Sequence, residues 1–229
     1  MNTKATNTVI VDTFIAPPCD EDIDILYQDE QLLLINKPSG LLSLSGKNPL
    51  NKDSVHYRLR RQYPTALMTH RLDFGTSGLM LIALNKTANA HITKQFQNRS
   101  IEKAYTSVLS GQLIDDWGVI DQPIARDSRC FPRQKICHLE GKPARSEYRV
   151  IARTNSPNTT RVSFKPLTGR THQLRIHSQS MGHPILGCDL YGSEQTQVMA
   201  GRLLLHATRL KFEHPESGEI IDYTSPCPF

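Results

Sequence analysis

The residues best suited to chemistry are concentrated in the segment His70–Gly78, which reads HRLDFGTSG and separates two apolar stretches. Asp73 supplies a carboxylate and Arg71 a cation, while Gly75 and Gly78 permit a tight turn. A purely structural alternative is that the glycines only form the turn and the neighbouring hydroxyl groups cap it. The kinase motif H-R-D is excluded, because Leu72 separates the arginine from the aspartate and no glycine-rich phosphate loop precedes it.

A second polar group, LTGRTHQLRIH, occupies residues 167–177. The pattern predicts a strand, a glycine turn and then a helix whose N-cap is Thr171. Arg170 beside that helix end would attract a phosphate or a carboxylate. His172 and His177 are five residues apart, whereas two zinc ligands on one helical face are four apart, so they are interpreted as solvent-facing or phosphate-contacting side chains.

Three more segments carry candidate residues. Tyr105 lies in EKAY, at the start of a predicted strand, where a tyrosine commonly has only a packing role. GHPILGCDLYG and LLLHA follow further along the chain and could be simple connections and core. Cys130, Cys137 and His138 lack the paired spacing of a zinc site, so no metal site is predicted. The five cysteines are scattered and odd in number, which favours free thiols in a reducing cytoplasm.

The charge is distributed unevenly. The chain carries a net charge of +5, but residues 125–175 contain twelve Lys or Arg against three Asp or Glu. The remainder is therefore mildly acidic. A basic region of this kind is typical of a surface that binds a phosphate backbone, although a solvated basic face is the alternative.

The elements that must position these residues are mostly short apolar runs. Strands are predicted at 24–28, 31–36, 66–69, 79–85, 104–110, 145–153, 160–166, 202–212 and 219–224, and helices at 51–62, 86–99 and 171–181, with Gly182 ending the last helix. Helices separated by two or more strands do not form a regular βαβ alternation. The sequence therefore predicts an α+β fold around a mixed, mainly antiparallel sheet.

The domain organisation follows from the same pattern. Residues 1–20 lack periodicity and are predicted to form an N-terminal arm, and residues 21–229 a single domain. No apolar run approaches the twenty residues of a membrane span, and no export signal is recognised. We expect a cytoplasmic monomer.

The order and separation of HRLDFGTSGL, EKAY, LTGRTHQLRIH, GHPILGCDLYG and LLLHA resemble the RluA family of RNA pseudouridine synthases. The resemblance covers about 200 residues, and it implies a mixed-sheet catalytic domain that isomerises uridine in RNA without a cofactor. It further implies that Asp73 is catalytic, that Tyr105 stacks on the target base, that Arg170 pairs with the aspartate and that Arg71 assists base flipping. Phe74 and Gly75 replace the more usual Met and Ala of this motif, at tolerant positions.

The implied chemistry requires such a set of residues. The bond between N1 and C1′ must break and a bond from C5 must form, with the carboxylate either attacking C1′ or removing a sugar proton. A buried carboxyl tends to stay protonated, so an arginine such as Arg170 would keep it ionised. The apolar runs Leu79–Leu84 and Leu203–Leu205 are predicted to form walls that exclude water.

The resemblance also bears on substrates. A target uridine leaves its stack most easily in loops, so stem-loops are the expected RNA elements. No S4-like domain is expected before the catalytic region, a layout similar to the dual-specificity members of the family. We therefore expect 23S rRNA and tRNA anticodon arms as partners, with the basic residues 125–175 binding phosphates.

Two other functions remain open from the residues alone. The first is a non-catalytic RNA-binding or ribosome-assembly module on the same fold. The second is a hydrolytic nucleoside glycosidase, which would need a second carboxylate to activate water, and Glu102 could approach Asp73 for that purpose.

Overall fold

The computed structural model describes residues 14–229, so residues 1–13 of the predicted arm lie outside the described residues. One ten-stranded sheet runs in the order β1-β2-β4-β11-β5-β10-β9-β6, with β3 paired to β4 and β12 paired to β11. A separate hairpin joins β7 and β8. The strands are β1 (Asp24–Gln28), β2 (Leu32–Lys37), β3 (Leu67–Met68), β4 (Ser77–Ala83), β5 (Glu102–Ser110), β6 (Trp117–Asp121), β7 (Ile124–Arg126), β8 (Gln134–Ile136), β9 (Arg145–Asn155), β10 (Asn158–Pro166), β11 (Leu205–Glu213) and β12 (Ile220–Thr224).

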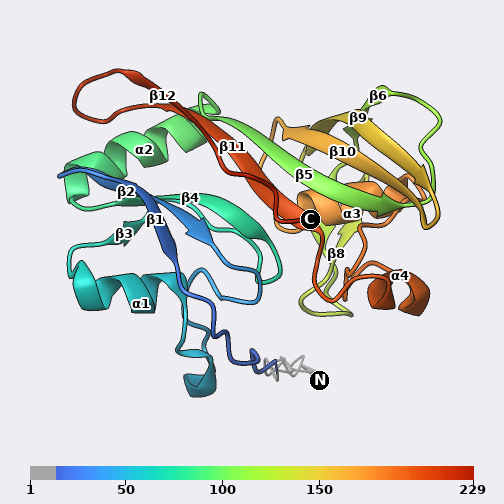
Figure 1. Ribbon diagram of the computed structural model, residues 1–229, viewed down its shortest axis with the longest axis horizontal. Helices are drawn as coiled ribbons and strands as arrows, with labels where there is room; N and C mark the ends of the chain where they lie inside the picture. Colours follow the sequence, from blue (N-terminus) through green and yellow to red (C-terminus); the bar gives the residue numbers. More distant parts are fainter. Residues whose placement is uncertain (1–13) are drawn as a thin grey trace, which may run out of the picture.

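The helices are α1 (Val55–Gln62), α2 (Lys86–Asn98), α3 (Gln173–Ser180) and the short α4 (Glu194–Val198), together with a 3₁₀ turn at Pro49–Asn51. In Figure 1, β5 and β11 run diagonally between two halves of the molecule. One half holds β1 to β4 with α1 and α2, and the other holds β6, β9 and β10 with α3 and α4. The predicted α+β class with a mixed sheet is confirmed.

The sheet is mixed because β4 and β11 pair in parallel, through His206 opposite Ser77 and Ala207 opposite Gly78, whereas the other pairings are antiparallel. Gly78 has a φ of +111°, and a Cβ atom placed on it would lie 2.4 Å from the Ala207 carbonyl oxygen. Only glycine therefore permits this close parallel contact. The contact holds the turn that precedes β4 next to β11.

Apolar residues of β4 are buried on both faces of the sheet. Leu79 and Leu81 pack in the cluster that includes Ile92 of α2, whereas Met80 and Ile82 pack in the cluster that includes Leu59 of α1. The prediction that Leu79–Leu84 walls the reaction site is wrong, because this strand is sandwiched between two cores. Leu203 and Leu205 do line the large cleft, as predicted.

Helix α3 begins differently from the prediction. Its N-cap is His172, with a left-handed φ of 56° and no side-chain capping bond. Thr171 is not the cap, because the turn is organised by Gln173, whose side-chain oxygen accepts hydrogen bonds from the Arg170 amide and the Thr168 hydroxyl. Gly182, with a φ of +80°, follows the C-cap residue Met181, so the end of the helix was predicted correctly.

The last seven residues of the predicted arm are hydrogen-bonded to the domain. The side chain of the buried Asn51 accepts a bond from the Ala16 amide at 2.8 Å and donates one to the Phe14 carbonyl oxygen at 2.7 Å. Arg58 of α1 donates to the Cys19 and Glu21 carbonyl oxygens. Among residues 14–229, no helix is both long and apolar enough to cross a bilayer.

Candidate active site

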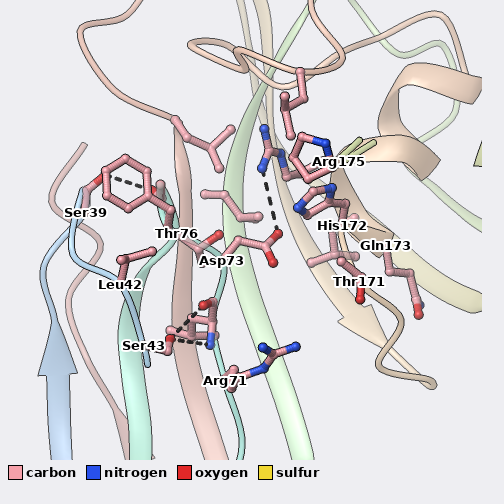
Figure 2. Close-up of a pocket in the computed structure, with 18 of the residues that line it drawn as sticks. Ser39, Leu42, Ser43, Arg71, Asp73, Thr76, Thr171, His172, Gln173 and Arg175 are labelled. Carbon is pink, nitrogen blue, oxygen red and sulfur yellow. Dashed lines mark hydrogen bonds and ion pairs between the residues drawn. The ribbon is translucent and has the colours of Figure 1, made fainter. Parts of the chain in front are cut away.

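A large cleft, with a volume of about 1650 Å³, contains the turn between β3 and β4 and the start of α3. Residues 69–76 form one wall, residues 166–175 form the opposite wall, and Tyr105 of β5 and Leu205 of β11 also line the cleft. Figure 2 shows Asp73 on one side of this space and the residues of α3 on the other. The polar motifs singled out in the sequence therefore meet at one place.

Asp73 is partly buried and faces a buried guanidinium group. Its Oδ2 atom lies 4.0 Å from Nη1 of Arg175, and the side chains are 26% and 5% exposed. Burial alone would lower the pKa of the Arg175 guanidinium, but Cys188, Asp73 and Asp189 raise it above its usual value. Arg175 is therefore a permanent cation within ion-pair distance of the carboxylate.

Arg170 does not pair with Asp73, and this prediction is corrected. Its Nε atom donates to the Pro143 carbonyl oxygen at 3.1 Å, and although Arg170 lines the same cleft, the arginine within ion-pair distance of Asp73 is Arg175. The two arginines differ because Arg170 lies in the turn before α3, whereas Arg175 lies in the first turn of the helix. Both arginines belong to the same sequence motif, but only the position and orientation of α3 show that Arg175 is the one that faces Asp73.

Arg175 is held by more than Asp73. Its Nη2 atom makes a short hydrogen bond to Asp189, and Nε and Nη2 each lie 3.4 Å from the Cys188 sulfur. A guanidinium fixed by two carboxylates and a thiol has little freedom to rotate. It presents Nη1 to Asp73 in a constant position.

Tyr105 and Arg71 line the same cleft. Burial raises the pKa of the Tyr105 hydroxyl, and the negative charge of Asp73 raises it further, so this ring stays neutral. Arg71 is exposed, and Figure 2 shows its guanidinium apart from the pair formed by Asp73 and Arg175. The structure thus brings Asp73, Tyr105, Arg71 and Arg170 to one cleft.

Sequence reasoning missed the loop that holds the Asp73 turn in place. The ammonium group of Lys37, which is fully buried, donates to the carbonyl oxygens of Pro38 at 2.8 Å, Leu41 at 2.7 Å and Phe74 at 3.2 Å. Burial lowers the pKa of Lys37 to about 7, against the raising effects of Cys19 and Asp73. The sequence signal for this support is a lysine at the end of an apolar strand, followed by Pro-Ser-Gly, because a buried ammonium group needs hydrogen-bond acceptors.

Two hydroxyl groups complete this support. Ser43 Oγ donates to the Leu72 carbonyl oxygen at 2.7 Å and accepts from the Leu72 amide at 3.1 Å. Ser39 Oγ donates to the Gly75 carbonyl oxygen at 2.7 Å. The backbone on both sides of Asp73 is therefore fixed by side chains of the segment that follows β2.

The histidines of the motifs have structural surroundings. His70 Nε2 accepts from the Leu81 amide at 3.0 Å, its ring lies 4.5 Å from that of Phe96, and burial lowers its pKa to about 3. His206 Nδ1 lies 2.8 Å from the Ser77 hydroxyl, and burial lowers its pKa to about 4. Both imidazoles are neutral near pH 7 and serve to hold β4.

Glu102 cannot serve as a second carboxylate beside Asp73. It pairs with Arg209 at 3.6 Å and with Lys211 at 3.4 Å, and it does not line the cleft. Asp189 does line the cleft, but it is bonded to Arg175. Within residues 14–229, no three His, Cys, Asp or Glu side chains are grouped to hold a metal ion. The arrangement supports chemistry by one carboxylate beside one arginine.

Comparison with known proteins gives a consistent result. The family described as RNA pseudouridylate synthase matches residues 31–180. The chain is 45% identical over 205 residues to the dual-specificity RNA pseudouridine synthase RluA of Yersinia pestis, covering 90% of this chain and 99% of that protein. It is 44% identical over 213 residues to the protein of the same name in Escherichia coli strain K12, covering 93% and 97%.

Solved structures show the same fold. The human RNA pseudouridylate synthase domain containing 1 superposes with a TM-score of 0.78 at 31% identity, covering 93% of this chain and 86% of that one. The human RNA pseudouridylate synthase domain containing 4 gives a TM-score of 0.72 at 24% identity, which supports the fold alone.

Proposed function

This chain belongs to the RNA pseudouridylate synthase family and is a pseudouridine synthase, and from that premise we propose that Asp73 is the residue that performs the isomerisation of uridine in RNA. One observation carries the assignment. The Asp73 carboxylate points into the large cleft and is met there by the buried Arg175 cation.

The isomerisation conserves the composition of the nucleotide. The bond between N1 and C1′ breaks, the uracil ring turns and a bond forms between C5 and C1′. C5 then loses its hydrogen as a proton to solvent, and N1 takes up a proton. Asp73 supports this either by attacking C1′ or by removing a sugar proton, and both routes require the ionised carboxylate. Arg175 stabilises that ionised form, which is the role that the sequence assigned to Arg170.

The other site residues act on the substrate as a whole. The face of Tyr105 would stack on the detached uracil and keep it in the cleft, and such stacking contributes about 1–3 kcal/mol. Leu203 and Leu205 would limit the entry of water, which would otherwise add at C1′ and release the uracil. Arg71 would assist the flipping of the target base, and Arg170, which also lines the cleft, would contact a phosphate of the RNA.

The proposed substrates are a stem-loop of 23S rRNA and the anticodon arm of tRNA. The support is the similarity to relatives that are named dual-specificity enzymes and that this chain covers almost completely. We further propose that the enzyme acts as a monomer in the cytoplasm, where its five free cysteines would stay reduced.

Asp73→Asn is the decisive variant for the catalytic assignment. We expect it to form no detectable pseudouridine in a stem-loop transcript under single-turnover conditions, while its affinity for the same RNA changes less than about threefold, because the amide keeps the shape but not the charge. Release of the C5 hydrogen from labelled uridine measures the reaction. A wild-type protein that binds RNA but forms no pseudouridine would support a non-catalytic module instead, and release of free uracil would support the glycosidase.

Arg175→Lys and Arg170→Ala separate the roles of the two arginines. Replacing the buried guanidinium should lower the single-turnover rate about 10- to 100-fold, because lysine cannot reproduce its fixed donors. Arg170→Ala should mainly weaken RNA binding. A larger rate loss for Arg170→Ala than for Arg175→Lys would contradict the assignment of Arg175.

Mapping of pseudouridines in rRNA and tRNA from cells with and without the protein tests the substrate pair. Loss of modification from both RNA classes is expected. Unchanged tRNA would remove half of that proposal while leaving the enzyme assignment intact.

A further inference from the structure

Tyr191 lies in the loop between α3 and α4, is 3% exposed, and has no part in the mechanism proposed above. Its hydroxyl oxygen accepts a hydrogen bond from the Gln134 backbone amide of β8 at 2.8 Å and lies 2.8 Å from Nδ1 of His172. Burial raises the pKa of Tyr191 to about 12 and lowers the pKa of His172, so this hydrogen bond joins a neutral hydroxyl to a neutral imidazole. One oxygen atom therefore joins β8 to the N-cap residue of α3.

The ring of Tyr191 joins the same two parts of the molecule. The guanidinium carbon of Arg175 lies 5.4 Å from the ring centroid, and that of Arg133 lies 5.6 Å from it. Arg175 faces Asp73, whereas Arg133 lies between β7 and β8. Both cations are within the distance at which an aromatic ring attracts a guanidinium group.

The contacts between Tyr191 and His172 hold the His172 backbone in an unusual conformation. Its φ of 56° is unusual for a residue with a side chain, and no side-chain cap stabilises the helix start. The Tyr191 hydroxyl and ring instead hold the His172 imidazole, with the two ring centroids 5.6 Å apart. The position of the first turn of α3, which carries Arg175, therefore depends on Tyr191.

The hairpin of β7 and β8 is a second part of the basic region that reaches the cleft, besides residues 166–175. It lies outside the ten-stranded sheet, and Phe131 and Pro132 of its loop line the cleft. The segment 124–136 carries four Lys or Arg and one Asp, a charge that suits RNA phosphates. Arg129 in the loop is exposed and contacts neither Tyr191 nor Asp73 through any hydrogen bond or ion pair within residues 14–229.

We propose that Tyr191 is a positioning residue that couples RNA binding on the β7–β8 hairpin to the orientation of Arg175 beside Asp73. This inference rests on the proposed function. A phosphate bound by the hairpin limits the movement of β8. Because the Tyr191 hydroxyl is hydrogen-bonded to both β8 and His172, the position of His172 is then limited as well. The first turn of α3, which follows His172, thereby holds Arg175 in one orientation. Part of the RNA binding energy thereby contributes to the rate of the chemical step rather than to affinity alone.

Tyr191→Phe removes only the hydroxyl group and tests the coupling. We expect a single-turnover rate at saturating RNA that is about tenfold lower, with a smaller change in affinity, because the ring and its contacts remain. Hydrogen exchange at the Gln134 amide should become faster in the free variant. Tyr148→Phe is the matched control, since Tyr148 lies on β9 outside the cleft, and it should leave the rate unchanged.

A double-mutant cycle with Arg129→Ala distinguishes coupling from a merely structural role. In the wild-type background, Arg129→Ala should lower both the affinity and the saturating rate, whereas in Tyr191→Phe its effect on the rate should disappear. Arg133→Gln provides a second test if Tyr191→Phe is poorly folded. It removes one cation from the ring of Tyr191 but keeps the Tyr191 hydroxyl, and it should also reduce the effect of Arg129→Ala on the saturating rate.

Strictly additive effects of Arg129→Ala and either second substitution on the saturating rate would overturn this inference. An unchanged rate in a folded Tyr191→Phe protein would do the same. Both results leave the proposed function standing, provided that the wild-type protein makes pseudouridine and Asp73→Asn does not. An inactive wild-type protein would instead remove the proposed function itself.

Discussion

A few individual side chains beneath the surface hold Asp73 and its neighbours in position. Lys37 satisfies three carbonyl oxygens around the turn of Asp73, and Arg175 is bonded to Asp189 while it faces Asp73. Each group is fully enclosed by partners, because an unpaired charge in such a position would cost several kcal/mol. His70 belongs to the same framework but must stay neutral, since its Nε2 atom accepts a backbone hydrogen bond.

The pH dependence of stability follows from His70. Burial lowers its pKa from 6.5 to about 3, so between these values the unfolded chain binds a proton that the folded chain does not. The free energy of unfolding should therefore fall as the pH falls from 6.5 towards 3, by up to about 1.4 kcal/mol per pH unit from this residue. Urea unfolding at several pH values measures the slope.

His70→Gln should show a shallower slope than the wild-type protein, although His206, with a pKa of about 4, contributes in the same direction. Well above pH 6.5 the two proteins should have the same slope, because His70 is neutral there in both the folded and the unfolded chain. A His70→Gln protein with the full wild-type pH dependence would show that this imidazole is not the group that titrates.

At the scale of elements, the parallel contact of β4 with β11 determines where the motifs meet. Asp73 lies just before β4, Tyr105 lies on β5 beside β11, and Arg175 lies on α3. Ala207 of β11 is paired with Gly78 on one side and with Tyr105 on the other, so this register places the end of the Asp73 turn level with Tyr105. Gly78 is the residue at which this contact is tightest.

Gly78→Ala should therefore disrupt the sheet. The added methyl group meets the Ala207 backbone, and the positive φ is unfavourable for alanine, which together should lower the free energy of unfolding by about 2–5 kcal/mol. Gly201→Ala is the control, because its Cβ atom would meet nothing within 4 Å. Thermal unfolding compares the two, and equal melting temperatures would show that the β4–β11 contact is not restrictive.

At the scale of the whole molecule, the charge of the cleft comes from both halves of the chain. The lining includes seven Lys or Arg and three Asp or Glu, but only Arg170 and Arg175 of these cations belong to the basic region 125–175. The others lie elsewhere in the sequence, at Lys47, Arg71, Arg99, Lys103 and Arg202. Folding thus builds a basic cleft that the sequence distribution alone did not indicate.

The affinity for a stem-loop RNA should consequently fall as the salt concentration rises, and the logarithm of the association constant should decrease linearly with the logarithm of the salt concentration. Lys47→Ala removes an exposed cation of the cleft, and it should reduce the magnitude of the slope by about 1. Lys211 pairs with Glu102 outside the cleft, so Lys211→Ala should keep the wild-type slope. If both variants shift the slope equally, RNA binding depends on net charge rather than on this cleft.

Local patterns in the sequence determined much of the fold. Apolar runs and turn residues predicted nine of the strands to within a few residues, and the capped, periodic segment of α2 was predicted almost to its ends. Strands β6, β7 and β8 were missed, because they are short or lie at an edge and carry mixed side chains whose pattern does not distinguish them from loops. Motif order was enough to indicate the family, and the two residues that it singled out, Asp73 and Tyr105, line one cleft.

Only the tertiary structure decided which groups touch. The choice of Arg175 over Arg170 depends on which side of α3 faces the cleft. Successive side chains of a helix point in directions about 100° apart, so the sequence of the motif does not identify the arginine that faces Asp73. Lys37 and Tyr191 gained their roles from partners distant in sequence, on the β3–β4 turn and on β8. A chain sequence specifies residue types and local geometry, whereas hydrogen bonds between distant segments exist only once the sheet has brought those segments together.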